Sequence, residues 1–459
     1  MSKIELGTTS APIVSTGEAT EPPVLSAGRE VEIKKESQSI RPKKLRQVVT
    51  LLGFSVELQT LRAVFLAYLV TRILVLFIIF VSSNSIPMRA GNFLYSNPDN
   101  LVLDGLVRDD SWWYTNIATR GYSMGNLKTG EQGNTAFFPL YPLAVKMMAG
   151  LTGNVFLAGI IVSNLAFLGT LFYLYALTRR EYGQETATRA VFYFAAAPTA
   201  VFFSAMYTES LFMLMVLATF YYAGAKQWDR AVLAGILASA TRNTGVLMAL
   251  VVALEGLSQQ GVRFWPRLAV REWSRSALSS HFKQQIKRTL SSWRSLLASA
   301  LVPIGLLSYM AYLSNTFGDP LGFIHVQATW GREVSGAGIT KVISNTISTL
   351  RVGTQFWAGQ YDAKTLLDIT FTLGFAPLVI ATVFKLRPAY SLFVVATFLI
   401  PLSTGSVGSM TRYVLMLVPC FMLLAHWGRK NWVDRVVLGI FLPLLCYFTI
   451  IFSHWYFAG

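Results

Sequence analysis

Long apolar stretches recur along almost the whole chain, and they constrain its fold more than any other feature. A helix needs about 20 mostly apolar residues to cross the hydrocarbon core of a bilayer. Only 14% of the 459 residues are charged and 53% are hydrophobic, whereas a soluble domain carries about 25% charged residues. We therefore expect an all-α integral membrane protein. The candidate spans are 63–83, 155–177, 190–206, 208–225, 231–256, 295–313, 369–384, 389–403, 412–427 and 436–452.

The basic residues predict how the chain is oriented in the membrane. Lys plus Arg number 39 against 23 Asp plus Glu, and most of the excess lies in short tracts between apolar stretches. Positively charged loops stay on the cytoplasmic side, where they meet anionic lipid, so this distribution argues against nucleic-acid binding. We place 178–189, 226–230 and 257–294 inside, and the loops 84–136 and 314–368 outside.

Segment 231–256 has basic residues on both flanks, although 26 residues ordinarily make one crossing. A helical hairpin broken at residues 241–245 resolves this conflict. Broken backbone at membrane depth is tolerated where it lines a cavity or is buried in protein. With this hairpin the chain has about eleven crossings, and Arg242 points at something polar.

The sequence divides into two parts. Residues 1–62 form a basic cytoplasmic tail and juxtamembrane segment that we expect to be disordered, and residues 63–459 form the polytopic membrane domain. Both cysteines lie inside apolar stretches, and the four histidines are scattered, so neither type predicts a metal centre. A divalent cation bound by Asp109 and Asp110 stays open, since carboxylates are suitable ligands.

The outer loop 84–136 carries most of the unusual residues. The run Arg108-Asp109-Asp110-Ser-Trp-Trp-Tyr114 begins a predicted amphipathic helix at the membrane interface, where Trp and Tyr act as anchors. An Asp at a helix start is often only an N-cap. That role alone does not explain the adjacent arginine, the aromatic density and the later Phe-Phe-Pro-Leu-Tyr141-Pro run together.

This loop resembles the PIG-V family of mannosyltransferases, whose pattern is Arg-Trp-Asp-x-x-Trp-Tyr followed by Phe-Phe-Pro-Leu-Tyr-Pro. The resemblance runs from about residue 60 to the C-terminus. It departs at one position, where this chain has Asp109 in place of the family's Trp. Either of the two adjacent carboxylates could therefore be the catalytic base, and motif position favours Asp110. Three further stretches are similar. The first is Pro198–Ser210, which contains Tyr207 and Glu209; the second is Thr241–Gly245, which contains Arg242; the third is Met410-Thr411-Arg412-Tyr413.

The resemblance implies a GT-C-type helical bundle that uses a polyprenyl-phosphate sugar as donor. It implies transfer of a mannosyl, or another hexosyl, residue to a hydroxyl of a glycan or glycolipid on the outer or lumenal face. A phosphate leaving group needs no proton, so one general base suffices and direct displacement inverts the anomeric carbon. The absence of a Gly-rich nucleotide motif fits a lipid-linked donor.

The candidate site combines an aspartate base with arginines, whose planar fork matches phosphate oxygens. Arg72 lies mid-span, where a charge is usually functional, and pairing with Glu209 or facing a cavity is weighed evenly against a purely structural role. Glu209 could orient the aspartate loop or cap its own helix. The expected residues are the bases Asp110 and Asp109, the phosphate ligands Arg242, Arg108, Arg120 and Arg412, and the supporting residues Tyr114, Tyr141, Tyr207, Glu209 and Arg72.

Two alternatives stay open, a GT-C transferase for another sugar and a lipid or solute transporter without chemistry. A transporter is expected to show internal repeats, and none is convincing here. We expect no cofactor, and as partners the donor, the acceptor and membrane lipid. The topology suits a plasma membrane, or an endoplasmic-reticulum membrane in a eukaryote.

Overall fold

The described part of the chain is almost entirely helical, which confirms the expected fold class. Two short strands, β1 Val48–Leu51 and β2 Phe54–Glu57, pair antiparallel ahead of the first helix. The tail 1–46 and the arginine tract 263–271 lie outside the described residues. The computed structural model describes residues 48–51, 54–89, 100–126, 129–262, 275–330, 340, 344, 363–403 and 407–456.

Five helices in the described ranges are long and apolar enough to cross a membrane, so the protein is a multi-pass membrane protein. A sixth candidate consists of two helices bent by 76° within residues 410–427. The expected count of eleven crossings is not confirmed. The five are α1 Leu58–Ser85, α5 Val155–Tyr182, α11 Trp293–Leu301 continuing into α12 Ile304–Phe317, α15 Ala363–Lys385 and α19 Asn431–Ser453.

The count differs because several predicted spans are built from shorter helices. The stretch 190–206 is interrupted, since α6 Gln184–Ala195 ends shortly before Pro198 and gives way to the 3-10 turn η1 Ala200–Phe203. The 16 residues of α7 Glu209–Gly224 reach about 24 Å, less than the roughly 30 Å core. α7 packs against α5, and its first five residues are buried.

The hairpin predicted within 231–256 is confirmed. Its arms are α8 Trp228–Thr241 and α9 Leu247–Gln259, separated by an extended Arg242 and the 3-10 turn η2 Asn243–Val246. The two arms run antiparallel, because the indole of Trp228 lies against Gly256 near the far end of the other arm. The break therefore presents Arg242 at the tip of a helical hairpin.

The stretch 412–427 is also broken. It consists of α17 Met410–Tyr413, the 3-10 turn η5 Val414–Met416 and α18 Val418–Trp427. Pro419 occupies the first turn of α18, where its missing N–H costs nothing. The remaining helices are α10 Arg275–Ser291, which leads into α11, and α16 Pro388–Ser403, which packs on α9 and α15.

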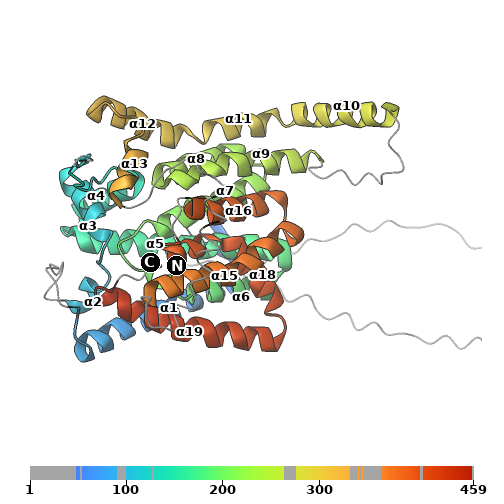
Figure 1. The fold of residues 1–459 in the computed structure, drawn as a ribbon. Coiled ribbons are helices and arrows are strands. Elements are labelled where there is room, and N and C mark those ends of the chain that lie inside the picture. Colours follow the sequence, from blue (N-terminus) through green and yellow to red (C-terminus); the bar gives the residue numbers. More distant parts are fainter. Residues whose placement is uncertain are drawn as a thin grey trace, which may run out of the picture. The chain divides into compact units, whose positions relative to one another are not determined.

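The short helices of the first outer loop gather at one end of the bundle (Figure 1). We call this the loop end; it holds α2 Leu101–Asp104, α3 Ser111–Arg120, α4 Leu140–Thr152 and α13 Gly322–His325, and the 3-10 turn η4 Val326–Trp330 follows α13. The ends of α1 and α19 meet there, where the Arg89 N–H donates to the His454 carbonyl at 3.2 Å. The opposite end, where α6, α8, α16 and α19 begin, we call the basic end.

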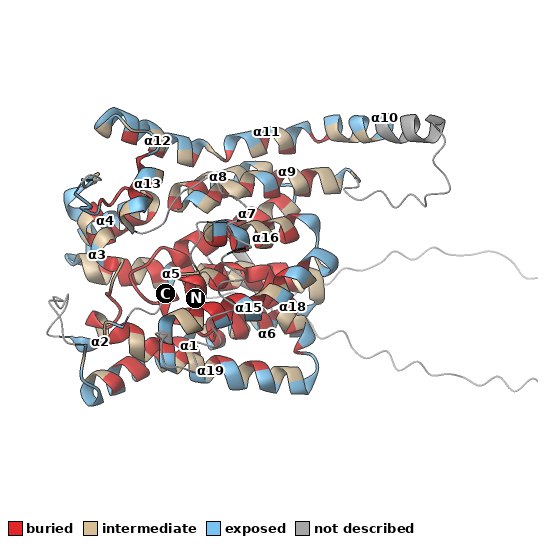
Figure 2. Ribbon diagram, in the orientation of Figure 1, coloured by how far each residue is buried: buried red, intermediate tan, exposed pale blue. Residues whose placement is uncertain are grey.

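Buried residues concentrate in the middle of the bundle around α5 and α7, whereas α11 and α12 carry many exposed ones (Figure 2). Arg72 of α1 belongs to this core and is 5% exposed. Its guanidinium donates to the carbonyls of Ala195 and Ala200 at 2.9 Å and to Ser204 Oγ at 2.8 Å. Arg72 therefore satisfies carbonyls freed where α6 ends, which agrees with the structural role considered for it, and it does not pair with Glu209.

Gly245 offers a test of the hairpin. A Cβ at this position would lie 2.1 Å from the Ala238 carbonyl oxygen, a backbone atom that cannot move aside alone. We expect Gly245→Ala to destabilise the protein by about 2 kcal/mol or more, measured by thermal unfolding in detergent. The control is Gly374→Ala in α15, where an added Cβ meets nothing within 4 Å. An equal melting temperature for both variants would contradict the described packing.

Candidate active site

A buried ion pair fixes the chain just before α3. Arg108 and Asp104 lie 2.6 Å apart, and both side chains are fully buried. Arg108 also donates through Nε to the Ser453 carbonyl at 2.9 Å, and its guanidinium lies 4.6 Å from the Trp455 ring centre. The expected role of Arg108 as a phosphate ligand does not fit this environment, because protein groups surround its guanidinium. Its position instead supports the backbone that carries Asp109 and Asp110.

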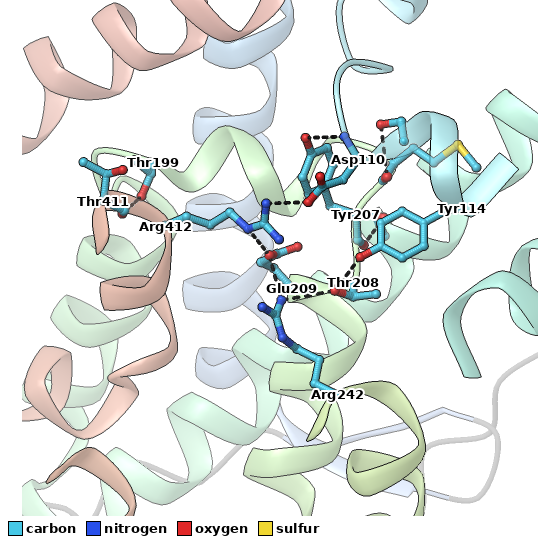
Figure 3. Close-up of polar contacts among 12 residues, drawn as sticks. Asp110, Tyr114, Thr199, Tyr207, Thr208, Glu209, Arg242, Thr411 and Arg412 are labelled. Atoms are coloured by element: carbon cyan, nitrogen blue, oxygen red, sulfur yellow. Dashed lines mark hydrogen bonds and ion pairs between the residues drawn. The ribbon is translucent and has the colours of Figure 1, made fainter. Parts of the chain in front are cut away.

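Asp110 starts α3, yet it does not act as a side-chain cap for that helix in the described structure. Its carboxylate Oδ2 accepts a hydrogen bond from Arg412 NH1 at 2.6 Å (Figure 3). Its backbone N–H donates to the Tyr207 hydroxyl at 3.2 Å, and that hydroxyl donates to the Arg108 carbonyl. Asp110 therefore occupies the N-cap position of α3, but its side chain pairs with Arg412 instead of capping the helix.

Glu209 is the carboxylate that connects two arginines. It is fully buried at the start of α7. Its Oε1 accepts from Arg412 Nε at 2.6 Å and from Arg242 NH1 at 2.9 Å (Figure 3). Its Oε2 is also buried and has no hydrogen-bond partner among the described residues. Of the two roles considered for Glu209, the orienting one agrees with this geometry.

The cluster of Asp110, Glu209, Arg242 and Arg412 contains two negative and two positive charges. Removing one partner from a buried ion pair leaves an uncompensated charge, which is strongly destabilising. Ionisable residues at membrane depth are rare and usually mark a functional site. The side chains of Asp110 and Arg242 are 17% and 15% exposed, so they are the members that reach toward solvent.

Asp368 of α15 positions Arg412, and it was not among the residues expected from the sequence. Its carboxylate accepts from the N–H of Ser409 at 3.1 Å and from the N–H and hydroxyl of Thr411 at 2.9 and 2.8 Å. Thr199 donates to the carbonyl of Thr411 at 2.9 Å. Ser409 takes a left-handed φ of 70°. An acidic residue at the edge of an apolar stretch could have indicated this positioning role. The predicted span begins at residue 369, however, so Asp368 was counted with the outer loop 314–368.

The supporting tyrosines come together as expected. The rings of Tyr114 and Tyr141 lie 5.0 Å apart, and the guanidinium of Arg412 lies 5.1 Å from the Tyr207 ring centre. The Tyr114 hydroxyl hydrogen-bonds with Thr208 Oγ1 at 3.3 Å, and Thr208 also accepts from Arg242. These aromatic rings enclose the charged groups on one side.

Arg120 is not brought to this cluster. It is exposed at the last position of the ten-residue α3. One end of such a helix is about 15 Å from the other. Arg120 thus lies away from Asp110, and its expected role as a phosphate ligand is not supported by this arrangement.

Asp109 differs from its neighbour. Its backbone has a φ of 44°, a left-handed conformation that Asp and Asn tolerate better than most residues. Burial, followed by the nearby Asp110, raises the pKa of Asp109 to about 6, and Arg108, Arg412 and Lys364 oppose this shift. Among the described residues, no group of three or more His, Cys, Asp or Glu is arranged to hold a metal ion.

The fold and the cluster define a polytopic helical membrane protein with a buried aspartate, glutamate and two arginines at its loop end. A model of the family Mannosyltransferase (PIG-V) matches residues 49–311, which is more than half of the chain. The chain belongs to this family.

Curated relatives match shorter regions. GPI mannosyltransferase 2 of Cryptococcus neoformans var. neoformans serotype D is 28% identical over 199 residues, which are 41% of this chain and 45% of that protein. GPI mannosyltransferase 2 of Drosophila pseudoobscura pseudoobscura is 29% identical over 140 residues, which are 28% of this chain and 29% of that protein. The chain thus matches less than half the length of these relatives.

Two solved membrane enzymes have a partly similar arrangement. ArnT from Cupriavidus metallidurans, solved with undecaprenyl phosphate, gives a TM-score of 0.45 at 14% identity. The match covers 80% of this chain and 63% of the ArnT chain. The Archaeoglobus fulgidus oligosaccharyltransferase, tethered to an acceptor peptide, gives a TM-score of 0.42 at 13% identity. The match covers 87% of this chain and 55% of the oligosaccharyltransferase chain.

The bonds of Asp368 predict a graded loss of stability. Thr411→Val removes one hydroxyl hydrogen bond and should cost about 1 kcal/mol. Asp368→Ala removes the carboxylate that accepts from two N–H groups and a hydroxyl and should cost about 3 kcal/mol or more. Thermal unfolding in detergent measures both. If Asp368→Ala is no less stable than Thr411→Val, the carboxylate does not hold the turn that carries Arg412.

Asp109 predicts a pH-dependent stability difference. Because burial raises its folded-state pKa above that of an unfolded Asp, the protonated form favours the fold, and this contribution is lost as the pH rises through about 6. Asp109→Asn keeps a neutral side chain that tolerates positive φ. The variant should unfold at a higher temperature than the wild type near pH 8, by about 1–2 kcal/mol in stability. Near pH 4 the two should agree; a gap independent of pH would refute the assignment.

Proposed function

We propose that the protein is a mannosyltransferase that moves a mannosyl residue from a polyprenyl-phosphate donor to an acceptor hydroxyl at the loop end of the bundle. The observation that carries this proposal is Arg412, which contacts Asp110 and Glu209 at 2.6 Å each, beside Arg242 on the same glutamate. One carboxylate near solvent and two arginines are the groups that such a transfer needs. Membership of the mannosyltransferase family supports the type of sugar.

Asp110 is the proposed general base. The acceptor hydroxyl gives its proton to Asp110 as its oxygen forms a bond to the anomeric carbon. The bond from that carbon to the phosphate oxygen breaks, and its electron pair leaves with the polyprenyl phosphate. Attack opposite the leaving group inverts the anomeric configuration. The leaving phosphate needs no proton at neutral pH, so one carboxylate suffices.

Arg242 and Arg412 are the proposed phosphate ligands. A guanidinium binds phosphate oxygens in a bidentate manner, and it is always charged. Arg242 uses NH1 for Glu209 and Thr208, and its side chain is 15% exposed. Glu209 is the proposed positioning residue, because its single oxygen Oε1 sets the separation of the two arginines.

The ion pair between Asp110 and Arg412 suggests how proton transfer and phosphate departure are coupled. Once Asp110 takes the proton, it no longer neutralises Arg412. The leaving phosphate gains one negative charge in the same step. Arg412 can then exchange a carboxylate partner for a phosphate partner without moving a net charge through the low-dielectric interior.

The proposed sidedness places the transfer on the outer or lumenal face. The basic end holds Arg179, Arg180, Arg429 and Lys430, and basic segments remain cytoplasmic. The loop end therefore faces away from the cytoplasm. This orientation is the same in a plasma membrane and in an endoplasmic-reticulum membrane.

The test uses the purified full chain with labelled polyprenyl-phosphate mannose and a glycolipid acceptor. Asp110→Asn should lower kcat by about 10²- to 10⁴-fold, the usual contribution of a general base, with little change in the KM for the donor. Arg242→Ala should instead raise that KM about tenfold or more, since a charge-assisted hydrogen bond is worth about 1.5–3 kcal/mol. Arg242→Lys should recover part of the affinity.

The matched control is Asp109→Asn, which alters the adjacent carboxylate. It should retain transfer within about tenfold of the wild type. If Asp109→Asn abolishes transfer while Asp110→Asn does not, the base is Asp109. If the wild type releases no mannose from the donor with any acceptor, the proposed reaction is wrong.

A further inference from the structure

A groove lies at the basic end of the bundle, far from the charged cluster. It runs between α1, α6 and α19 and has a volume of about 740 Å³. Two of these helices, α1 and α19, are candidate membrane spans, so the groove opens toward lipid rather than bulk water. Its lining residues are Ala63, Leu66, Ala67, Val70, Gln184, Glu185, Thr188, Arg189, Phe192, Tyr193, Asp434 and Leu438.

The polar and apolar residues of the groove are separated along its length. Gln184, Glu185 and Arg189 lie in the first turns of α6, and Asp434 lies in the first turn of α19. The apolar residues come later in each helix, such as Phe192 in α6. Ala63 and Ala67 are one turn apart on α1, and their small side chains leave space beside it. This order matches a phospholipid, with a headgroup at the interface and an acyl chain deeper in the membrane.

The charged groups at the polar end specify the kind of headgroup. Arg189 Nε donates to Asp434 Oδ1 at 3.2 Å, and Tyr193 donates to the same oxygen at 2.6 Å. Arg189 NH2 contacts Glu185 at 3.1 Å. Arg189 NH1 is buried and has no hydrogen-bond partner among the described residues. The hydrogen bonds described for Asp434 reach only Oδ1, which leaves Oδ2 as an acceptor.

We propose that this groove binds a phospholipid with a primary ammonium headgroup, such as phosphatidylethanolamine. The lipid phosphate accepts from the exposed part of the Arg189 guanidinium, whose side chain is 19% exposed, and its ammonium donates to Asp434 Oδ2, whose side chain is 35% exposed. Among the charged residues that line the groove, two carboxylates face one guanidinium, which favours a headgroup that carries an ammonium beside its phosphate. A quaternary ammonium such as that of phosphatidylcholine has no N–H to donate. The acyl chain lies along Leu66, Val70 and Phe192.

The experiment is a native mass-spectrometric titration of the delipidated full chain. Phosphatidylethanolamine, phosphatidylcholine and phosphatidylglycerol with identical acyl chains are compared, with a polyprenyl phosphate as a fourth ligand. Phosphatidylethanolamine should bind at least about tenfold more tightly than the other phospholipids, the ratio expected for one charge-assisted hydrogen bond. Equal binding of all three phospholipids would overturn the headgroup assignment.

Three variants locate the binding. Asp434→Asn should remove most of the preference for phosphatidylethanolamine over phosphatidylcholine. Leu66→Trp fills the groove and should weaken phosphatidylethanolamine binding about tenfold. Leu69→Trp lies one turn along α1, is 49% exposed, does not line the groove and should bind as the wild type does.

Three further outcomes would overturn the proposal. In the first, Leu66→Trp and Leu69→Trp weaken binding equally, so the lipid does not occupy the groove. In the second, polyprenyl phosphate displaces phosphatidylethanolamine and Leu66→Trp abolishes its binding, so the groove holds the donor chain. In the third, Asp434→Asn folds with an unchanged melting temperature and keeps the full preference. None of these outcomes depends on sugar transfer.

Discussion

The ion pairs that the buried carboxylate of Glu209 makes with two arginines are the interactions on which the loop end of this bundle depends. The carboxylate accepts hydrogen bonds from Arg242 at the tip of one hairpin and from Arg412 in the short helix α17, just before the bend into α18. Each arginine lies where a helix is interrupted, and each interruption exposes backbone groups that the bilayer could not satisfy. Tight packing around the glutamate shelters these interruptions from lipid. The charged cluster and the interrupted helices therefore stabilise one another.

A second set of bonds positions this cluster from outside. Asp368 holds the turn before Arg412, and the buried pair of Asp104 and Arg108 holds the turn before Asp110. Both supports connect a loop to a long helix, α15 in one case and α19 in the other, where the Ser453 carbonyl accepts from Arg108. A site built in this way has its side chains fixed by rigid elements before any ligand arrives, which is the arrangement that catalysis by preorganised charges requires.

The sequence predicted much of this arrangement, and its failures have physical causes. Charge on both flanks of 231–256 was enough to place a break at Arg242, since orientation rules act on short loops. Hydropathy could not distinguish a crossing from a half-length helix, because a helix such as α7 is apolar and most of its residues are buried in protein. Arg108 and Arg412 looked alike as arginines near a loop. Only their partners separate them. Arg108 pairs with Asp104 four residues earlier and with the Ser453 carbonyl 345 residues away, whereas the partners of Arg412 lie 203 and 302 residues away.

The distance in sequence between Glu209 and Arg412 has a consequence for biogenesis. The glutamate enters the membrane about 200 residues before its second arginine is made. At about 5–20 residues per second, the ribosome needs on the order of 10–40 s to synthesise that interval. Throughout this time the nascent chain carries a buried carboxylate with at most Arg242 beside it. The charged cluster is thus complete only after the segment that carries Arg412 has been inserted. We expect membrane quality control to recognise a chain truncated before residue 412 as unfinished.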